Sequence, residues 1–204
     1  MLLSLLYTFD AFSLKRIGLG DFTVFCMFGP LLMTECMLVL QPDLALGTDT
    51  LIYSVPVGLL TVGILHSNNV RDIEVDMAAG VFTIAQSLGV EGGAFVYILL
   101  LVVAYSFPLY FALQMQRWRC LYPLACLPWG IYLCKCIRKG TQTPKAWIMQ
   151  EMPQRTAQHN LLWCTLYCMS FATDAMNVRL LLGCLFYLGG EFYTVAVRRL
   201  IRTL

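Results

Sequence analysis

The stretch AFVYILLLVVAYSFPLYFAL, residues Ala94–Leu113, runs for twenty residues without a charged side chain. A helix that crosses the hydrocarbon core of a bilayer needs about 20 apolar residues, so this stretch predicts a membrane-spanning helix. Apolar stretches of the same kind recur along the chain, at Phe22–Leu40, Leu51–Leu65, Cys120–Ile137, Asn160–Thr173 and Leu180–Val197. Lipid offers no partner to the unpaired backbone groups of an open sheet, and the alternation of barrel strands is absent. We therefore predict an all-α, multi-pass transmembrane bundle of about six helices.

The composition supports this prediction. The chain is 59% hydrophobic and 13% charged, whereas soluble domains are roughly 45–50% apolar and about 25% charged. A soluble globule and a disordered chain are both excluded. The formal net charge of +2 is too small for a nucleic-acid-binding surface, so the bilayer is the expected partner. No repeat or second soluble domain interrupts residues 1–204, which predicts one membrane domain.

The basic residues between the apolar stretches indicate an orientation. Ten of the fourteen Lys and Arg fall on one face of the membrane and three on the other, and Lys135 lies at the end of its segment on the first face. Loops rich in Lys and Arg stay in the cytoplasm, which places residues 66–93 on the cytoplasmic side. The endoplasmic reticulum, Golgi and mitochondrial membranes are the candidate locations.

The loop with the clearest chemistry is HSNNVRDIEVDMAAGVFTIAQSLG, residues 66–89. Asn68, Asp72 and Asp76 recur every four residues and form one polar stripe on a helix. Two carboxylates at this spacing repel each other, so the stripe needs a cation. Oxygen ligands favour Mg²⁺, which proteins commonly hold through one or two carboxylates and a substrate phosphate. The neighbouring Arg71 is a candidate ligand for a phosphate oxygen.

The residues after this stripe predict how the loop ends. Glu74 projects to another side of the helix and is the least suitable ligand among the acids. Gly80 fits the position just after a helix. Thr83 and Gln86 form the pattern of a capping box that starts a second short helix, which Gly89 would end.

This pattern resembles a known family. Asn68-x-x-x-Asp72-x-x-x-Asp76 is similar to the second Asp-rich motif of the UbiA superfamily of intramembrane prenyltransferases, and its Asn-Asn-x-Arg-Asp form resembles the menaquinone branch. Two other stretches agree with the family in place and order. They are Gly18-Leu19-Gly20-Asp21 followed by Phe28-Gly29-Pro30, and Met152-Pro-Gln-Arg-Thr-Ala-x-x-Asn160.

The resemblance implies an activity and a site. Enzymes of this family are helical bundles that use Mg²⁺ to transfer a polyprenyl group from its diphosphate to an aromatic acceptor. By position, Asn68, Asp72 and Asp76 would be the ligands of Mg²⁺ and diphosphate, with Asp72 and Asp76 as the catalytic carboxylates. Arg71 would bind the diphosphate. The implied acceptor is a naphthoquinone precursor, in menaquinone, vitamin K or ubiquinone-type biosynthesis.

The family's first Asp-rich motif has no counterpart here. The acids before Asp72 are never paired at Asp-x-x-x-Asp spacing. We therefore expect the chain to cover the second half of the fold, beginning near the end of the fourth helix, and to be inactive alone. Two alternatives stay open: a carrier whose Asp72 and Asp76 bind a permeating divalent cation, and a non-catalytic membrane adaptor that binds a sterol or an isoprenoid.

Other polar residues receive simpler interpretations. The nine cysteines lie in apolar segments without a C-x-x-C pair, which predicts small buried hydrophobes. His66 and His159 flank apolar stretches, which predicts interfacial positions. Glu35 and Glu191 are predicted to be buried acids, and buried acids in a membrane are candidate functional residues.

Overall fold

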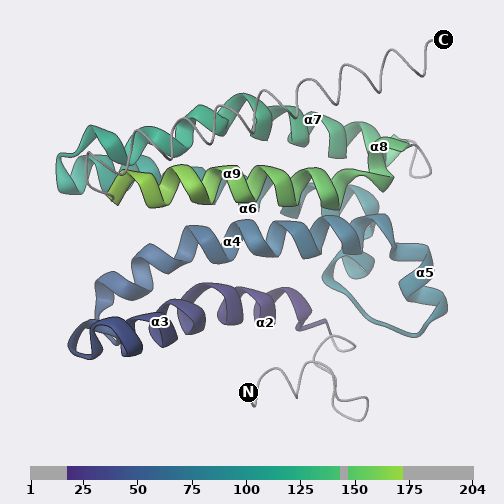
Figure 1. Ribbon diagram of the computed structural model, residues 1–204. Helices are drawn as coiled ribbons and strands as arrows, with labels where there is room; N and C mark the ends of the chain where they lie inside the picture. The colour runs from purple at the N-terminus through teal and green to yellow at the C-terminus, as the bar shows by residue number, and fades with distance from the viewer. Residues whose placement is uncertain (1–17, 143–146, 172–204) are drawn as a thin grey trace.

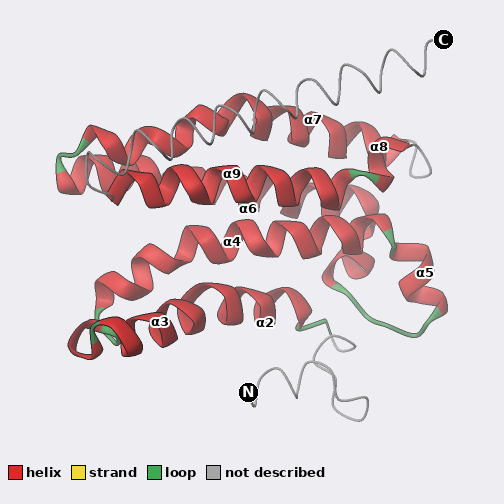
Figure 2. Cartoon of the chain, in the orientation of Figure 1, coloured by secondary structure: helices red, strands yellow, loops and turns green. Residues whose placement is uncertain are grey.

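The computed structural model describes residues 18–142 and 147–171, and those residues are almost entirely helical, with no strand in these two ranges. Figure 2 shows the helices joined by short loops. The predicted all-α class is confirmed. Four helices are long and apolar enough to cross a membrane: Gly20–Leu40, Thr48–Arg71, Ile84–Met115 and Trp118–Gln142. Each contains one of the first four apolar stretches.

The first membrane-length rod consists of α2 (Gly20–Cys26), a π-helical turn (Met27–Leu31) and α3 (Leu32–Leu40). The π turn contains Pro30. Proline lacks an N–H and its ring clashes with the preceding turn, and a wider turn accommodates that defect inside an otherwise continuous helix. The rod therefore continues through the proline.

A short 3₁₀ turn, Pro42–Leu44, leads into α4 (Thr48–Arg71), which contacts α2, α6 and α9. In Figure 1, α4 lies between the α2–α3 rod and α9. After α4 comes the short helix α5 (Ile73–Ala78), which lies at the same end of the bundle as α8 (Trp147–Gln150).

The start of α6 (Ile84–Met115) matches the expectations for this loop. Gly80 follows α5 with a φ of +67°, a conformation that costs other residues a clash with Cβ. The Thr83 side chain accepts from the Gln86 backbone N–H, and the Gln86 side chain accepts from the Thr83 N–H, so the capping box is confirmed. Gly89 has non-helical dihedrals, after which the helix resumes.

The last described part contains a 3₁₀ segment (Trp118–Cys126), α7 (Leu127–Gln142) and α9 (Met152–Phe171). Buried aromatic and aliphatic side chains from α6, α7 and α9 form the core, among them Tyr97, Leu101, Leu133, Trp163 and Tyr167. The fifth apolar stretch lies largely in α9, which has 20 residues but is not among the four helices that are both long and apolar enough to cross a membrane. The sixth, Leu180–Val197, lies outside the described residues.

The acids and cysteines of the apolar segments differ in how far they are buried. Glu35 was predicted to be buried, but its side chain is exposed on α3, a helix in which no residue is buried. Glu191 and Cys184 lie outside the described residues. The other eight cysteines are free thiols. Of these, Cys36 and Cys168 are exposed, and the rest are buried or half-buried, as expected of small hydrophobes.

Candidate functional site

Three of the four predicted site residues form one hydrogen-bonded cluster at the end of α4. The Arg71 guanidinium donates from Nε to Asp72 Oδ1 at 2.7 Å and from Nη2 to Asp72 Oδ2 at 2.6 Å. Nη2 also donates to Asn68 Oδ1 at 2.5 Å. This two-pronged arrangement is the geometry in which arginine binds a carboxylate best. All three side chains are half-buried, so the cluster remains reachable from solvent.

Asp76 lies four residues further on, in the short helix α5, so the single helix expected through Asn68, Asp72 and Asp76 is divided at Asp72. The backbone N–H of Asp72 donates to the Asn68 carbonyl at 3.0 Å, and that of Asp76 donates to the Asp72 carbonyl at 2.8 Å. Asp72 itself has a φ of −101° and separates α4 from α5. The four-residue register nevertheless continues from Asn68 to Asp76. Glu74, in α5, is exposed.

The donor set of this cluster suits Mg²⁺. The cluster offers one carboxylate and one amide oxygen, and Asp76 in α5 adds a second carboxylate. All are hard donors, and Mg²⁺ usually keeps several waters or phosphate oxygens beside its few protein ligands. Within the described residues, no group of three or more His, Cys, Asp or Glu side chains gathers around one point.

A second polar cluster lies deeper, between α2, α4 and α6. The Asp21 carboxylate contacts two residues of α4: Oδ2 lies 2.5 Å from His66 Nδ1, and Oδ1 accepts from Asn69 Nδ2 at 3.0 Å. His66 Nε2 donates to the Gly93 carbonyl of α6 at 3.0 Å. His66 is fully buried and Asp21 is 7% exposed. An ionisable pair this deep must be paired to be tolerated, and here every ring nitrogen and carboxylate oxygen has a partner.

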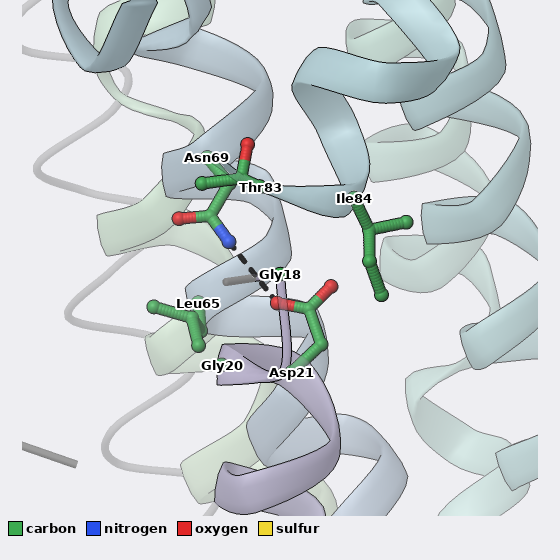
Figure 3. A pocket seen from close by; sticks show the side chains of 7 residues that line it. All are labelled: Gly18, Gly20, Asp21, Leu65, Asn69, Thr83 and Ile84. Atoms are coloured by element: carbon green, nitrogen blue, oxygen red, sulfur yellow. Dashed lines mark hydrogen bonds between the residues drawn. The ribbon is translucent and has the colours of Figure 1, made fainter. Parts of the chain in front are cut away.

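A small cavity opens beside this second cluster. It is lined by Gly18, Gly20, Asp21, Leu65, Asn69, Thr83 and Ile84. Figure 3 shows the Asn69 amide directed at the Asp21 carboxylate, with Leu65 and Ile84 on the two sides of the view. Its volume is about 10 Å³, the space that one water molecule requires. The cavity as it stands admits water and excludes an aromatic ring.

The deeper cluster was not anticipated from the sequence. His66 was predicted to be interfacial, which is wrong, because its imidazole bridges α2 and α6. His159 was likewise predicted to flank a membrane segment. It is instead fully buried in α9 and bonded to the Tyr105 hydroxyl at 2.8 Å. One available signal was Asp21 itself, an acid next to a membrane-length apolar run, since such acids are expected to have a partner.

Comparison with protein families gives a match over most of the chain. Residues 1–152 match the model of the UbiA prenyltransferase family. This range contains both the Asn68–Asp72 cluster and the deeper cluster around Asp21. No solved structure matches the chain significantly.

Curated relatives carry the same family name. The chain is 34% identical over 164 residues to the UbiA prenyltransferase domain-containing protein 1 homolog of Drosophila melanogaster, which covers 80% of this chain and 43% of that protein. It is 36% identical over 171 residues to the Danio rerio protein of that name, covering 80% and 46%. For Dictyostelium discoideum the values are 35% over 129 residues, 62% and 38%. The chain thus spans less than half the length of these relatives.

Proposed function

The chain belongs to the UbiA prenyltransferase family, and from that premise we propose that the end of α4 binds a polyprenyl diphosphate together with Mg²⁺ for transfer of the prenyl group to an aromatic acceptor. The observation that carries the proposal is the cluster of Asn68, Arg71 and Asp72 at the end of a membrane-length helix, with Asp76 one turn beyond. Hard oxygen donors, a guanidinium and an adjoining apolar bundle suit a ligand with an anionic head and a hydrocarbon tail.

Each residue of the cluster has a distinct role in this proposal. Asp72 and Asp76 would hold the metal, and Asn68 would complete the set with its amide oxygen. When bound, Mg²⁺ supplies the positive charge that stabilises the departing diphosphate. Arg71 already orients Asp72 through two hydrogen bonds. Its guanidinium has five N–H donors, which is enough to hold Asp72 and also bind a diphosphate oxygen.

The rest of the described bundle would keep bulk water away from the reacting groups. Prenyl transfer develops positive charge on the prenyl carbon as the diphosphate leaves, and water would capture that carbon. The helices around α4 present an apolar interior, with Leu60, Tyr97 and Leu101 almost completely buried. Exclusion of bulk water from such an interior favours attack by the electron-rich ring of the acceptor.

For the acceptor we propose a naphthoquinone precursor of menaquinone or vitamin K type. The support is the Asn68-Asn69-x-Arg71-Asp72 sequence and the similarity to proteins named UbiA prenyltransferase domain-containing protein 1. The relatives are more than twice as long as the matched region, so further ligands for the metal and the acceptor would come from a longer form of the protein.

The test is prenyl transfer in microsomes with geranylgeranyl diphosphate, a naphthoquinone acceptor and Mg²⁺. It compares this chain, a version extended upstream, and the extended version carrying Asp72→Ala and Asp76→Ala. We expect activity in the extended version and a loss of at least about 100-fold in the double variant. Glu74→Ala is the matched control, because this exposed acid of α5 lies outside the stripe, and it should retain activity.

Two results would contradict the proposal. Equal activity in the double variant would remove Asp72 and Asp76 from the reaction. Absence of activity in every version, with normal membrane insertion, would favour a non-catalytic adaptor that binds an isoprenoid or a sterol. Binding of labelled geranylgeranyl diphosphate, measured with and without Mg²⁺, then separates a different acceptor from an adaptor that does not recognise the diphosphate.

A further inference from the structure

We propose that Asp21 is a positioning residue that fixes the orientation of the diphosphate-binding end of α4, an inference that rests on the function proposed above. Asp21 belongs to α2 and is 45 residues from His66 and 48 from Asn69 along the chain. We call Asp21, His66 and Asn69 the polar clamp. The stripe of Asn68, Asp72 and Asp76 contains none of these three residues. Two residues of the clamp, His66 and Asn69, nevertheless lie beside Asn68 in the last turns of α4.

The clamp determines how α4 is rotated about its own axis. Residues three apart on a helix lie on the same face, so His66 and Asn69 both point at the Asp21 carboxylate. One carboxylate oxygen contacts each of them. Two contacts from a single planar group fix both the rotation of α4 and its distance from α2.

Rotation of the clamp face sets the direction of the stripe. Asn68 lies on the neighbouring face of α4, and Asp72 follows its last residue, while backbone hydrogen bonds at i and i+4 spacing continue from Asn68 through Asp72 to Asp76. Because a helix turns as one body, fixing His66 and Asn69 also fixes where the Asn68 side chain projects, and the hydrogen bond from the Asp72 N–H to the Asn68 carbonyl holds Asp72 at the same end of α4. The hydrogen bonds of Arg71 cannot do this, since their partners Asn68 and Asp72 are its own near neighbours.

A third helix is held by the same clamp. His66 Nε2 donates to the carbonyl of Gly93 in α6. At Gly93 the two helices approach closely, because a Cβ built there would lie 2.7 Å from Val70 Cγ2. The imidazole therefore connects the Asp21 carboxylate on one side with the α6 backbone on the other. Helices α2, α4 and α6 meet at one buried residue of α4.

A positioning role and a proton-transfer role for Asp21 make different predictions for Asp21→Asn. An asparagine side chain can donate from Nδ2 to a neutral His66 Nδ1 and accept at Oδ1 from Asn69, so the geometry of the clamp survives. It cannot take up a proton as a carboxylate does. Asp21→Ala removes both contacts and leaves the Asn69 amide and the imidazole without their partner.

The experiment uses the full chain in phosphatidylcholine nanodiscs and two readouts. Arg71 is the only Lys or Arg between Arg16 and Arg117, so tryptic cleavage at this bond, followed by mass spectrometry, reports directly on the end of α4. Equilibrium binding of labelled geranylgeranyl diphosphate with Mg²⁺ reports on the stripe. Tyr97→Phe is the matched control, because it removes a buried hydrogen bond between α6 and α9, to Thr156 at 2.9 Å, without touching the clamp.

We expect Asp21→Ala to increase the rate of cleavage at Arg71 by at least tenfold and to weaken diphosphate binding by at least tenfold, while Asp21→Asn and Tyr97→Phe stay within threefold of the unmodified chain. Unchanged cleavage in Asp21→Ala would overturn the positioning role. Equal losses in Asp21→Asn and Asp21→Ala would also overturn it, because asparagine keeps both contacts of the clamp and a positioning role predicts that it stays close to the unmodified chain. Absence of diphosphate binding by both the unmodified chain and its upstream-extended version would contradict the proposed function, and the cleavage readout would still decide the role of the clamp.

Discussion

Two histidines are completely buried in this molecule, and they are held in opposite ways. His66, between α2, α4 and α6, has a partner at both ring nitrogens, and one of these partners is the Asp21 carboxylate. His159, between α6, α7 and α9, bonds the Tyr105 hydroxyl through Nε2, while its Nδ1 has no hydrogen-bond partner within the described part of the chain. The nearby Trp163 Nε1 also lacks one there.

The packing around the two histidines differs as well. Around His66 the helices approach through glycines and a paired charge. Around His159 they pack through rings, with Trp163 and Tyr167 stacked at 5.0 Å between centroids and Trp129 edge-on to the imidazole. A paired charge specifies one geometry, whereas rings and unpaired polar atoms tolerate replacement. We therefore expect the molecule to depend on His66 and to be insensitive to His159.

The largest expected effect is that of His66→Leu. The substitution leaves the Asp21 carboxylate buried without its main partner, and breaking a buried pair in this way costs about 3–5 kcal/mol. The free energy of unfolding in mixed detergent micelles, measured by denaturation with increasing SDS, checks this value. A loss below about 1 kcal/mol would show that the carboxylate is not buried as described.

A smaller loss is expected where the α2–α3 rod meets α4. A Cβ on Gly29 would lie 3.2 Å from the Gly58 Cα and 3.3 Å from the Ser54 carbonyl oxygen. Backbone atoms cannot rotate away, so Gly29→Ala should cost about 1–3 kcal/mol through separation of the two helices. The same denaturation series measures it. An unchanged stability would mean that the rod is free to shift and that close approach does not define this side of the bundle.

Tyr105→Phe tests the polar contact on the aromatic side. It removes the hydroxyl that bonds His159 and keeps the ring, so a loss of about 1 kcal/mol is expected, as for a hydrogen bond between membrane helices. Thermal unfolding of the purified protein, monitored by circular dichroism, is the measurement. A loss of stability as large as that of His66→Leu would contradict the expectation that polar contacts matter less around His159 than around His66.

The smallest effect is predicted for His159→Leu. The substitution removes a buried nitrogen without a described partner, which stabilises, and leaves the Tyr105 hydroxyl unpaired, which destabilises by a similar amount. The net change should stay within about 1 kcal/mol of zero. The free energies of unfolding of His159→Leu and His66→Leu should be measured under identical conditions. Similar losses in the two variants would contradict the expected difference between the two histidines.

Much of the fold could be predicted because its signals are local. Twenty uncharged residues at Ala94–Leu113 are sufficient to predict a spanning helix. Gly80, Thr83 and Gln86 indicate a helix end and a helix start from their own backbone requirements, and the structure confirms both. The meeting of Asn68, Arg71 and Asp72 was foreseeable for the same reason, since all three lie within five residues.

The parts that could not be predicted depend on contacts between distant segments. His66 lies two residues before Asn68, the first residue of the stripe, and nothing in its neighbourhood reveals that Asp21 and Gly93 are its partners. The exposure of Glu35 could not be predicted either, because the same apolar composition surrounds a buried and an exposed helical face. Periodicity indicates that a helix has faces, but the identity of the neighbouring helix decides which face is covered.

The separation of Asp21 and His66 also matters while the chain is being made. A ribosome adds roughly 5–20 residues per second, so the 45 residues between them take roughly 2–9 seconds to synthesise. During that interval α2 has to wait at or in the membrane with an acid whose partner has not yet emerged. During biogenesis, α2 therefore depends on α4 for the partner of its buried acid. A nascent chain that stops before His66 contains an Asp21 carboxylate without that partner.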